Sequence, residues 1–297
     1  MDREREIPAV WLAGAGCSGC SISLLNAAGS GIRNLLLDEV VPGKHISMRF
    51  HSTIMAGQGE PTLTVLHDTG KREKGGYLLV VEGAIPVGAN GKFCGIGETQ
   101  KGEHLSMVEA TEELGRNALA VVAIGSCSSF GGIPASGPNP TQCMSLTGFF
   151  KEKGIKTPVI NIPGCPPHPD WFVGTVAHVL IHGLPGPEAL DEIGRPLMYY
   201  GALIHEHCPR RAYFDAGKFA KKSGDPGCLY KLGCKGPTTY ADCPTRMWNH
   251  GTNWCVGAGS PCLGCVEPEF PDKNAPLYEK TNEARLLRFK VPQTATR

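Results

Sequence analysis

Short apolar runs alternate with helical patterns along the first two-thirds of the chain. The strand-sized runs, rich in aliphatic residues, are 8–13, 46–50, 76–82, 119–124 and 158–161. Between them, apolar residues recur at helical spacing in 22–37, 105–114, 144–153 and 171–181. Strands that alternate with helices predict an α/β fold built on a parallel, doubly wound sheet.

The periodicity stops after Gly183. Pro185, Pro187 and Pro196 indicate a linker, and the rest of the chain is rich in turns and cysteines. We therefore expect two domains, 1–190 and 191–297, the second smaller and dependent on inorganic centres for its folding.

Composition excludes several classes of protein. The net charge of +1 gives no global attraction to nucleic acid or membrane, and no apolar run approaches the roughly 20 residues of a membrane span. Thirteen cysteines raise the possibility of disulfides, but the number is odd and the chain is too large to need them. Locally, residues 205–235 hold seven Lys or Arg against three Asp or Glu, which indicates a solvated face or a docking surface for an acidic partner.

The cysteines fall into two sets. Cys17, Cys20, Cys127 and Cys165 lie in glycine- or proline-rich loops that follow strands, so we expect them at one edge of the sheet. Four thiolates suit zinc or a [4Fe–4S] cluster, and the wide spacing in sequence favours the cluster. The late set can ligate about two four-coordinate centres; it comprises His205, Cys208, Cys228, Cys234, Cys243, Cys255, Cys262 and Cys265.

Two alternative functions remain open on the residues alone. The segment Gly14–Gly19 spells G-x-G-x-x-G after a strand, with Asp38 about twenty residues on, as in a nucleotide-binding dehydrogenase that uses NAD. The C-x-x-C pair inside this motif speaks against a phosphate loop. A zinc-stabilised interaction module would instead carry zinc in the late cysteines.

Seven motifs in the chain, taken in order, resemble the small subunit of nickel–iron hydrogenases. They are 16–21, 82–86, 125–134, 163–169, 205–209, 228–237 and 262–268. The resemblance covers about residues 8–280 and implies a flavodoxin-like first domain and a C-terminal iron–sulfur domain. It also implies a hydrogenase, an oxidoreductase of class EC 1.12, that interconverts H2 with protons and electrons together with a large subunit that holds the nickel–iron site.

The resemblance assigns ligands to three clusters. Cys17, Cys20, Cys127 and Cys165 would hold a proximal [4Fe–4S]; His205, Cys208, Cys228 and Cys234 would hold a distal [4Fe–4S]; Cys243, Cys255, Cys262 and Cys265 would hold the medial cluster. Many relatives have proline at the position of Cys255 and a [3Fe–4S] medial cluster. With Cys255 as fourth ligand we expect [4Fe–4S], as in the selenium-containing branch that this chain resembles here; otherwise the medial cluster is [3Fe–4S].

Other positions refine this picture. Gly19 and Gly132 stand where oxygen-tolerant relatives have two extra cysteines, so we expect an ordinary four-thiolate proximal cluster. Cys94 and Cys143 match no ligand position, and we expect structural burial for both.

Partners and location follow from the same resemblance. The partners would be the large subunit and an external electron carrier: a cytochrome, a ferredoxin or a further subunit. The sequence starts without a visible leader, so we expect the cytoplasm; a periplasmic protein is the alternative if a twin-arginine leader was removed. The end of the chain, including 286–291, offers no membrane helix.

Overall fold

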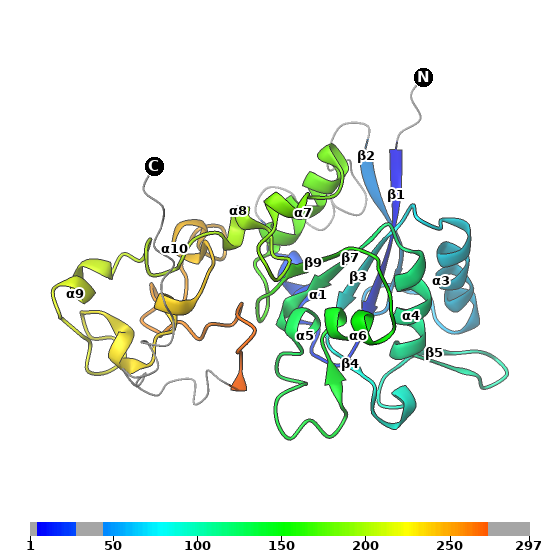
Figure 1. The fold of residues 1–297 in the computed structure, drawn as a ribbon, viewed down its shortest axis with the longest axis horizontal. Coiled ribbons are helices and arrows are strands. Elements are labelled where there is room, and N and C mark those ends of the chain that lie inside the picture. The colour runs from blue at the N-terminus through cyan, green and yellow to red at the C-terminus, as the bar shows by residue number, and fades with distance from the viewer. Residues whose placement is uncertain (1–4, 28–43, 273–297) are drawn as a thin grey trace. The chain divides into compact units, whose positions relative to one another are not determined.

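A computed structural model describes residues 5–27 and 44–272 of the chain (Figure 1). It comprises two compact units, Met1–Gly201 with Cys265–Pro268, and Ala202–Gly264 with Glu269–Arg297. Four residues of the late cysteine region thus belong to the first unit. The division into folding domains at residues 190 and 191 stays a prediction.

The first unit is built on a five-stranded parallel sheet. Its strands are β1 (Arg5–Ala13), β2 (Lys44–His51), β3 (Leu78–Glu82), β7 (Ala120–Ile124) and β9 (Val159–Ile162), in the order β2-β1-β3-β7-β9. This order is typical of flavodoxin-like sheets. The predicted α/β fold with a parallel sheet is confirmed. Each observed strand overlaps a predicted one, and their ends differ by at most two residues except at the start of β1, which begins three residues earlier than predicted.

Helices connect the strands and cover the sheet. They are α1 (Gly19–Leu24), α3 (Glu60–Arg72), α4 (Met107–Asn117), α5 (Gly125–Phe130), α6 (Leu146–Glu152), α7 (Pro169–His182) and α8 (Leu197–Tyr200). Three predicted helices correspond to α4, α6 and α7; of the fourth, 22–37, the part from 28 on lies outside the described residues, as does Asp38. Helix α3 was not predicted from the sequence. Its only buried aliphatic side chains are those of Leu63 and Leu66, so its apolar periodicity is weak.

Both faces of the sheet are buried. On β1, Val10 and Leu12 belong to a core shared with Leu114 of α4. Trp11, between them, points to the opposite face, where its ring lies 5.3 Å from that of Phe172 in α7. Burial on both faces explains why the central strands read as continuous apolar runs.

Short elements complete the first unit. Strand β4 (Ile85–Pro86) pairs with β8 (Cys143–Met144), and β5 (Gly95–Glu98) pairs with β6 (His104–Ser106). Two 3-10 turns are η1 (Gly88–Gly91) and η2 (Pro187–Ala189).

The second unit has only short helical elements among its described residues. They are α9 (Arg211–Asp215), η3 (Leu229–Leu232), η4 (Gly236–Thr238) and α10 (Cys243–Arg246). Within residues 5–27 and 44–272, no helix is both long and apolar enough to cross a membrane.

Candidate cluster-binding sites

The early cysteines follow three parallel strands at the carboxyl edge of the sheet. Cys17 lies in the loop after β1 and Cys20 in the first turn of α1. Cys127 lies in α5, directly after β7, and Cys165 follows β9 by three residues. Since the carboxyl ends of parallel strands share one edge, the topology gathers all four thiols there.

The thiols interact electrostatically with one another. Burial raises the pKa of Cys20 well above its usual range, and Glu82, Cys127, Cys17 and Cys165 raise it further in that order. Burial also raises the pKa of Cys127 to about 12, with Cys165 as the next cause. Such a group loses its protons readily only when cations take up the negative charge, so it fits a metal cluster.

Glycines allow the backbone to approach these sulfurs. A Cβ on Gly125, which has a φ of +84°, would lie 2.5 Å from Cys20 Sγ. A Cβ on Gly132, with a φ of +49°, would lie 3.1 Å from Cys127 Sγ. The Gly19 amide donates to Cys17 Sγ at 3.3 Å. Only glycine combines this backbone conformation with the missing side chain.

A buried carboxylate, which opens the motif 82–86 but was given no role from the sequence, orients the first loop. Glu82 ends β3, is 1% exposed, and accepts hydrogen bonds from Trp11 Nε1 at 2.9 Å and from the Cys20 amide at 3.0 Å. The Ser21 amide and hydroxyl also donate to it. Glu82 therefore fixes the start of α1, and with it Cys20, relative to β1 and β3. In the sequence, Glu82 could have been singled out because it is an acidic residue at the end of the otherwise apolar strand β3.

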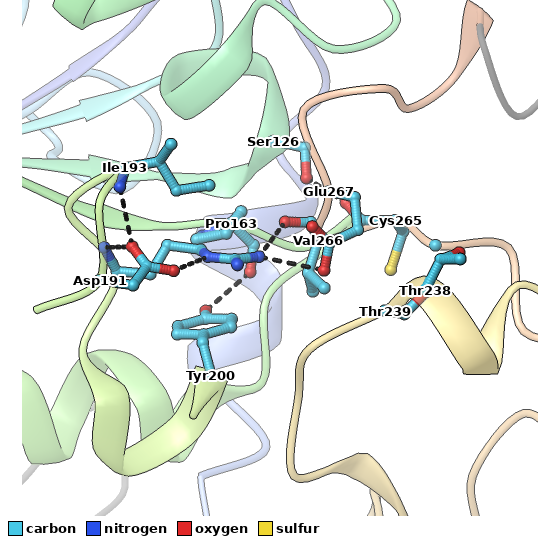
Figure 2. A network of polar contacts seen from close by, with 12 residues as sticks. Ser126, Pro163, Asp191, Ile193, Tyr200, Thr238, Thr239, Cys265, Val266 and Glu267 are labelled. Atoms are coloured by element: carbon cyan, nitrogen blue, oxygen red, sulfur yellow. Dashed lines mark hydrogen bonds and ion pairs between the residues drawn. The ribbon is translucent and has the colours of Figure 1, made fainter. Parts of the chain in front are cut away.

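Ser126 ties together the loops that carry Cys127 and Cys165. The Ser126 amide donates to the Gly164 carbonyl at 2.9 Å, and the Gly164 amide donates back to Ser126 Oγ at 2.9 Å. The Ser126 hydroxyl then donates to the carbonyl of Cys265 (Figure 2). One buried serine thus joins the early cysteine loops to a cysteine of the late set.

Arg195 holds the segment 265–268 in the first unit. It is 5% exposed, and its Nε lies 2.6 Å from Asp191 Oδ2. Its Nη1 donates at 3.1 Å to both the Val266 carbonyl and Glu267 Oε1. Figure 2 labels Asp191, Val266 and Glu267, the residues that these contacts join. Two carboxylates compensate the buried guanidinium, which satisfies the condition for burying a charge.

In the second unit, the predicted distal ligands line one cavity. His205, Cys208, Cys228 and Cys234 line it together with apolar side chains such as Val256, and its volume of about 10 Å³ is that of a small, nearly closed cavity. The topology thus brings the predicted histidine and three thiols together.

The imidazole of His205 is available as a ligand. Its Nε2 is buried and has no hydrogen-bond partner among the described residues. Burial first, then Arg211, holds its pKa below the usual value. A neutral imidazole with a free ring nitrogen is the form that binds a metal, so this donor set fits an iron–sulfur cluster.

The predicted medial ligands are divided between the two units. Cys243, Cys255 and Cys262 belong to the second unit and Cys265 to the first. Within the second unit, the Cys262 amide donates to the distal residue Cys234 at 3.3 Å. The ligand assignments of all three sets stay predictions.

The two remaining cysteines belong to the first unit, where Cys143 is buried and Cys94 is half-buried. Cys143 is 5% exposed, and Cys94 packs against the main hydrophobic core. In the described part of the chain, no group of three or more His, Cys, Asp or Glu side chains is arranged as it would be around a single metal ion.

Comparison with known proteins places the chain in a family. Residues 200–278 match the C-terminal family of the NiFe/NiFeSe hydrogenase small subunit, and residues 17–179 match the family of the NADH ubiquinone oxidoreductase 20 Kd subunit. The chain is 46% identical to the periplasmic [NiFeSe] hydrogenase small subunit of Desulfomicrobium baculatum, over 92% of this chain and 87% of that protein. It is 42% identical to the quinone-reactive Ni/Fe-hydrogenase small chain of Wolinella succinogenes, over 92% of this chain and 74% of that protein.

Solved structures agree with this result. A reduced, active Ni-Fe-Se hydrogenase from Desulfomicrobium baculatum matches with a TM-score of 0.87 and 45% identity, over 93% of this chain and 100% of that chain. An actinobacterial-type NiFe-hydrogenase from Ralstonia eutropha matches with a TM-score of 0.86 and 30% identity, over 98% of this chain and 86% of that chain. The parallel-sheet fold is that of hydrogenase small subunits. The chain belongs to the NiFe/NiFeSe hydrogenase small-subunit family.

Family membership settles earlier alternatives and corrects one expectation. The resemblance found in the motifs is confirmed, and the dehydrogenase and zinc-module interpretations are set aside. The expected cytoplasmic location is wrong, because relatives from Desulfomicrobium baculatum and Solidesulfovibrio fructosivorans are named periplasmic. The start of the given sequence was a poor guide to location, since leaders are removed on maturation.

Proposed function

We propose that the chain is the electron-transfer small subunit of a heterodimeric nickel–iron hydrogenase, which interconverts H2 with two protons and two electrons. The supporting observation is the gathering of Cys17, Cys20, Cys127 and Cys165 at one edge of the sheet, within electrostatic reach of one another. The cavity lined by His205 and three cysteines supports a second redox centre.

The proximal and distal donor sets would each hold a [4Fe–4S] cluster. When bound, such clusters take up and release single electrons. The chain would supply thiolates, amide hydrogens directed at sulfur, and a low-dielectric surround, which together tune the redox potential. In the distal set His205 is neutral where a thiolate would be negative, so it should raise the potential.

The medial set would be Cys243, Cys255, Cys262 and Cys265. With all four ligands the group would be [4Fe–4S]; without Cys255 it would be [3Fe–4S]. A cysteine in place of the proline common among relatives favours the four-iron form, which has one more thiolate charge to stabilise the oxidised state.

The large subunit would cover the carboxyl edge of the sheet. Cys17 and Cys165 are exposed there in the isolated chain, and thiolate ligands of a low-potential cluster need shielding from water and oxygen. The nickel–iron site would lie on that partner, and an external electron carrier would receive electrons at the distal end. The names of the relatives favour the periplasm as the site of action.

The test compares two single-thiol variants of the intact heterodimer. Cys17→Ser should abolish H2-dependent reduction of methyl viologen and remove about four iron atoms. Cys94→Ser, which changes a cysteine outside the ligand sets, should keep both activity and iron. Equal activity in the two variants would refute the proposal.

A further inference from the structure

A basic surface in the second unit surrounds a hollow near the distal ligands. The hollow has a volume of about 310 Å³ and is lined by Phe219, Lys221, Lys231 and neighbouring residues. Lys218 and Lys222 flank Phe219 and Lys221 in the sequence, and all four lysines are exposed. We call Lys218, Lys221, Lys222 and Lys231 the lysine rim.

The lysine rim is not neutralised within its own unit. In the described residues, no ion pair engages any of the four ammonium groups. The nearby acids are otherwise used: Asp215 pairs with Arg211 at 2.9 Å, and Asp225 accepts from the backbone amides of Lys221 and Lys222. Over residues 205–235, seven Lys or Arg outnumber three Asp or Glu. The rim therefore presents an excess of positive charge to solvent.

Backbone pairing joins the rim to a distal ligand. Phe219 and Cys228 form a parallel bridge, in which the Cys228 amide donates to the Lys218 carbonyl at 2.9 Å. The Ala220 amide donates to the Cys228 carbonyl at 3.0 Å. The segment that carries Lys218 and Lys221 is thus fixed directly against Cys228.

Aromatic rings make the second connection. The ring of Phe214 lies edge-on to His205 with centroids 4.6 Å apart, and Phe219 lies 5.9 Å from Phe214. Lys231 Nζ lies 4.6 Å from the centroid of Phe219. Packed rings thus run from the imidazole of His205 to the lysine rim. Between a carrier bound in the hollow and the distal donor set there would be only these packed side chains.

We propose that the lysine rim is the docking surface for a small acidic one-electron carrier protein. The inference rests on the proposed function and deepens it by naming the partner class. Two carrier molecules are each reduced by one electron for every H2 oxidised; the two protons are released at the large subunit and none crosses the rim. Complementary charge accelerates association and orients it without requiring a large interface.

The test uses the intact heterodimer with two protein carriers of opposite charge, an acidic plant-type [2Fe–2S] ferredoxin and a basic multihaem c-type cytochrome. At low salt the ferredoxin should be reduced faster than the cytochrome, and its rate should fall steeply as salt screens the charges. Reversing the rim (Lys218→Glu, Lys221→Glu, Lys222→Glu, Lys231→Glu) should lower the ferredoxin rate at least tenfold. Methyl viologen, a small dication, should still be reduced.

A charge-matched control separates local from global effects. Lys71→Glu, Lys74→Glu, Lys92→Glu and Lys101→Glu change the same number of exposed charges in the first unit, and this variant should reduce ferredoxin as the wild type does. An unchanged rate of ferredoxin reduction in the rim variant would overturn the docking proposal. So would faster reduction of the cytochrome than of ferredoxin by the wild type. In either case, reduction of viologen would still support the proposed hydrogenase function.

Binding supplies a readout that does not depend on turnover. Calorimetry should give tighter ferredoxin binding to the wild type than to the rim variant. This result tests the docking surface even if neither protein reduces viologen. A failure to reduce viologen would count against the proposed function alone. Rim-dependent binding to phosphatidylglycerol vesicles, with ferredoxin binding unaffected, would assign the surface to a membrane and refute an acidic protein partner.

Discussion

The Ser126 hydroxyl donates to the carbonyl of Cys265, a residue 139 positions later in the chain. Ser126 precedes Cys127 and is hydrogen-bonded to Gly164, which precedes Cys165. A single side chain therefore links two predicted proximal ligand loops to a predicted medial ligand.

Ser126→Ala should loosen that link. The variant leaves the buried Gly164 amide and the Cys265 carbonyl without their partner, at a cost of about 1–3 kcal/mol. We expect weaker magnetic coupling between the proximal and medial clusters in electron paramagnetic resonance. Ser136→Ala, which removes an exposed hydroxyl bonded to Ile133, should leave the coupling unchanged; a coupling that survives in Ser126→Ala would contradict the link.

Arg195→Met should release the segment 265–268. Asp191 and Glu267 would lose a buried counter-charge, and breaking a buried ion pair typically costs about 3–5 kcal/mol. The check is the free energy of unfolding of the heterodimer. Arg211→Met breaks an exposed pair with Asp215 and should cost under about 1 kcal/mol; similar losses in the two variants would show that the buried network does not hold the segment.

Gly125→Ala should block assembly of the proximal cluster. The added methyl would lie 2.5 Å from Cys20 Sγ, whereas at Gly154 nothing lies within 4 Å. Both glycines have positive φ, +84° and +63°, so alanine imposes a similar backbone cost of about 1 kcal/mol at either position. Iron analysis should show about four iron atoms fewer in Gly125→Ala only. Full iron content in that variant would argue against Cys20 as a ligand.

His51 should make the stability depend on pH. Burial lowers its pKa to about 4, and its Nδ1 accepts from the Thr53 amide at 3.2 Å, which fits a neutral ring. Above about pH 6.5 the ring is neutral in both folded and unfolded chains. As the pH falls from about 6.5 to 4, the unfolded chain takes up the proton first, so stability falls by roughly 3 kcal/mol.

The pH effect is isolated by His51→Gln. The difference in unfolding free energy between this variant and the wild type should change across about pH 6.5–4, while the same comparison for the exposed His104→Gln should stay flat. A constant difference for His51→Gln would mean that the imidazole is not buried in neutral form.

Cys255→Pro should convert a four-iron medial cluster into a three-iron cluster. The variant removes one of the four predicted thiolates and introduces the residue that many relatives carry. We expect one iron atom fewer per chain and a new [3Fe–4S] signal in electron paramagnetic resonance of the oxidised protein. If that signal is already present in the wild type, Cys255 is not a ligand.

The sheet could be predicted because its strands are buried on both faces and read as uninterrupted apolar runs. The placement of Cys17, Cys127 and Cys165 followed from the same topology, since parallel strands end at one edge. Helix α3 was missed because only Leu63 and Leu66 of its apolar residues are well buried.

The supporting residues could not be predicted in the same way. Glu82 acts on amides 61 and 62 positions away, and Arg195 on a carbonyl 71 positions away. Such contacts depend on how distant segments meet, which neither periodicity nor motif spacing encodes. The location was misjudged because it was inferred from the start of the given sequence, which does not determine location.

The most direct test of the electron-transfer assignment is the iron, acid-labile sulfide, zinc and nickel content of the heterodimer, purified without oxygen. We predict about a dozen iron and a dozen sulfide per small subunit, with nickel only when the large subunit is present. Zinc without sulfide, or none of these metals in protein kept free of oxygen, would contradict it.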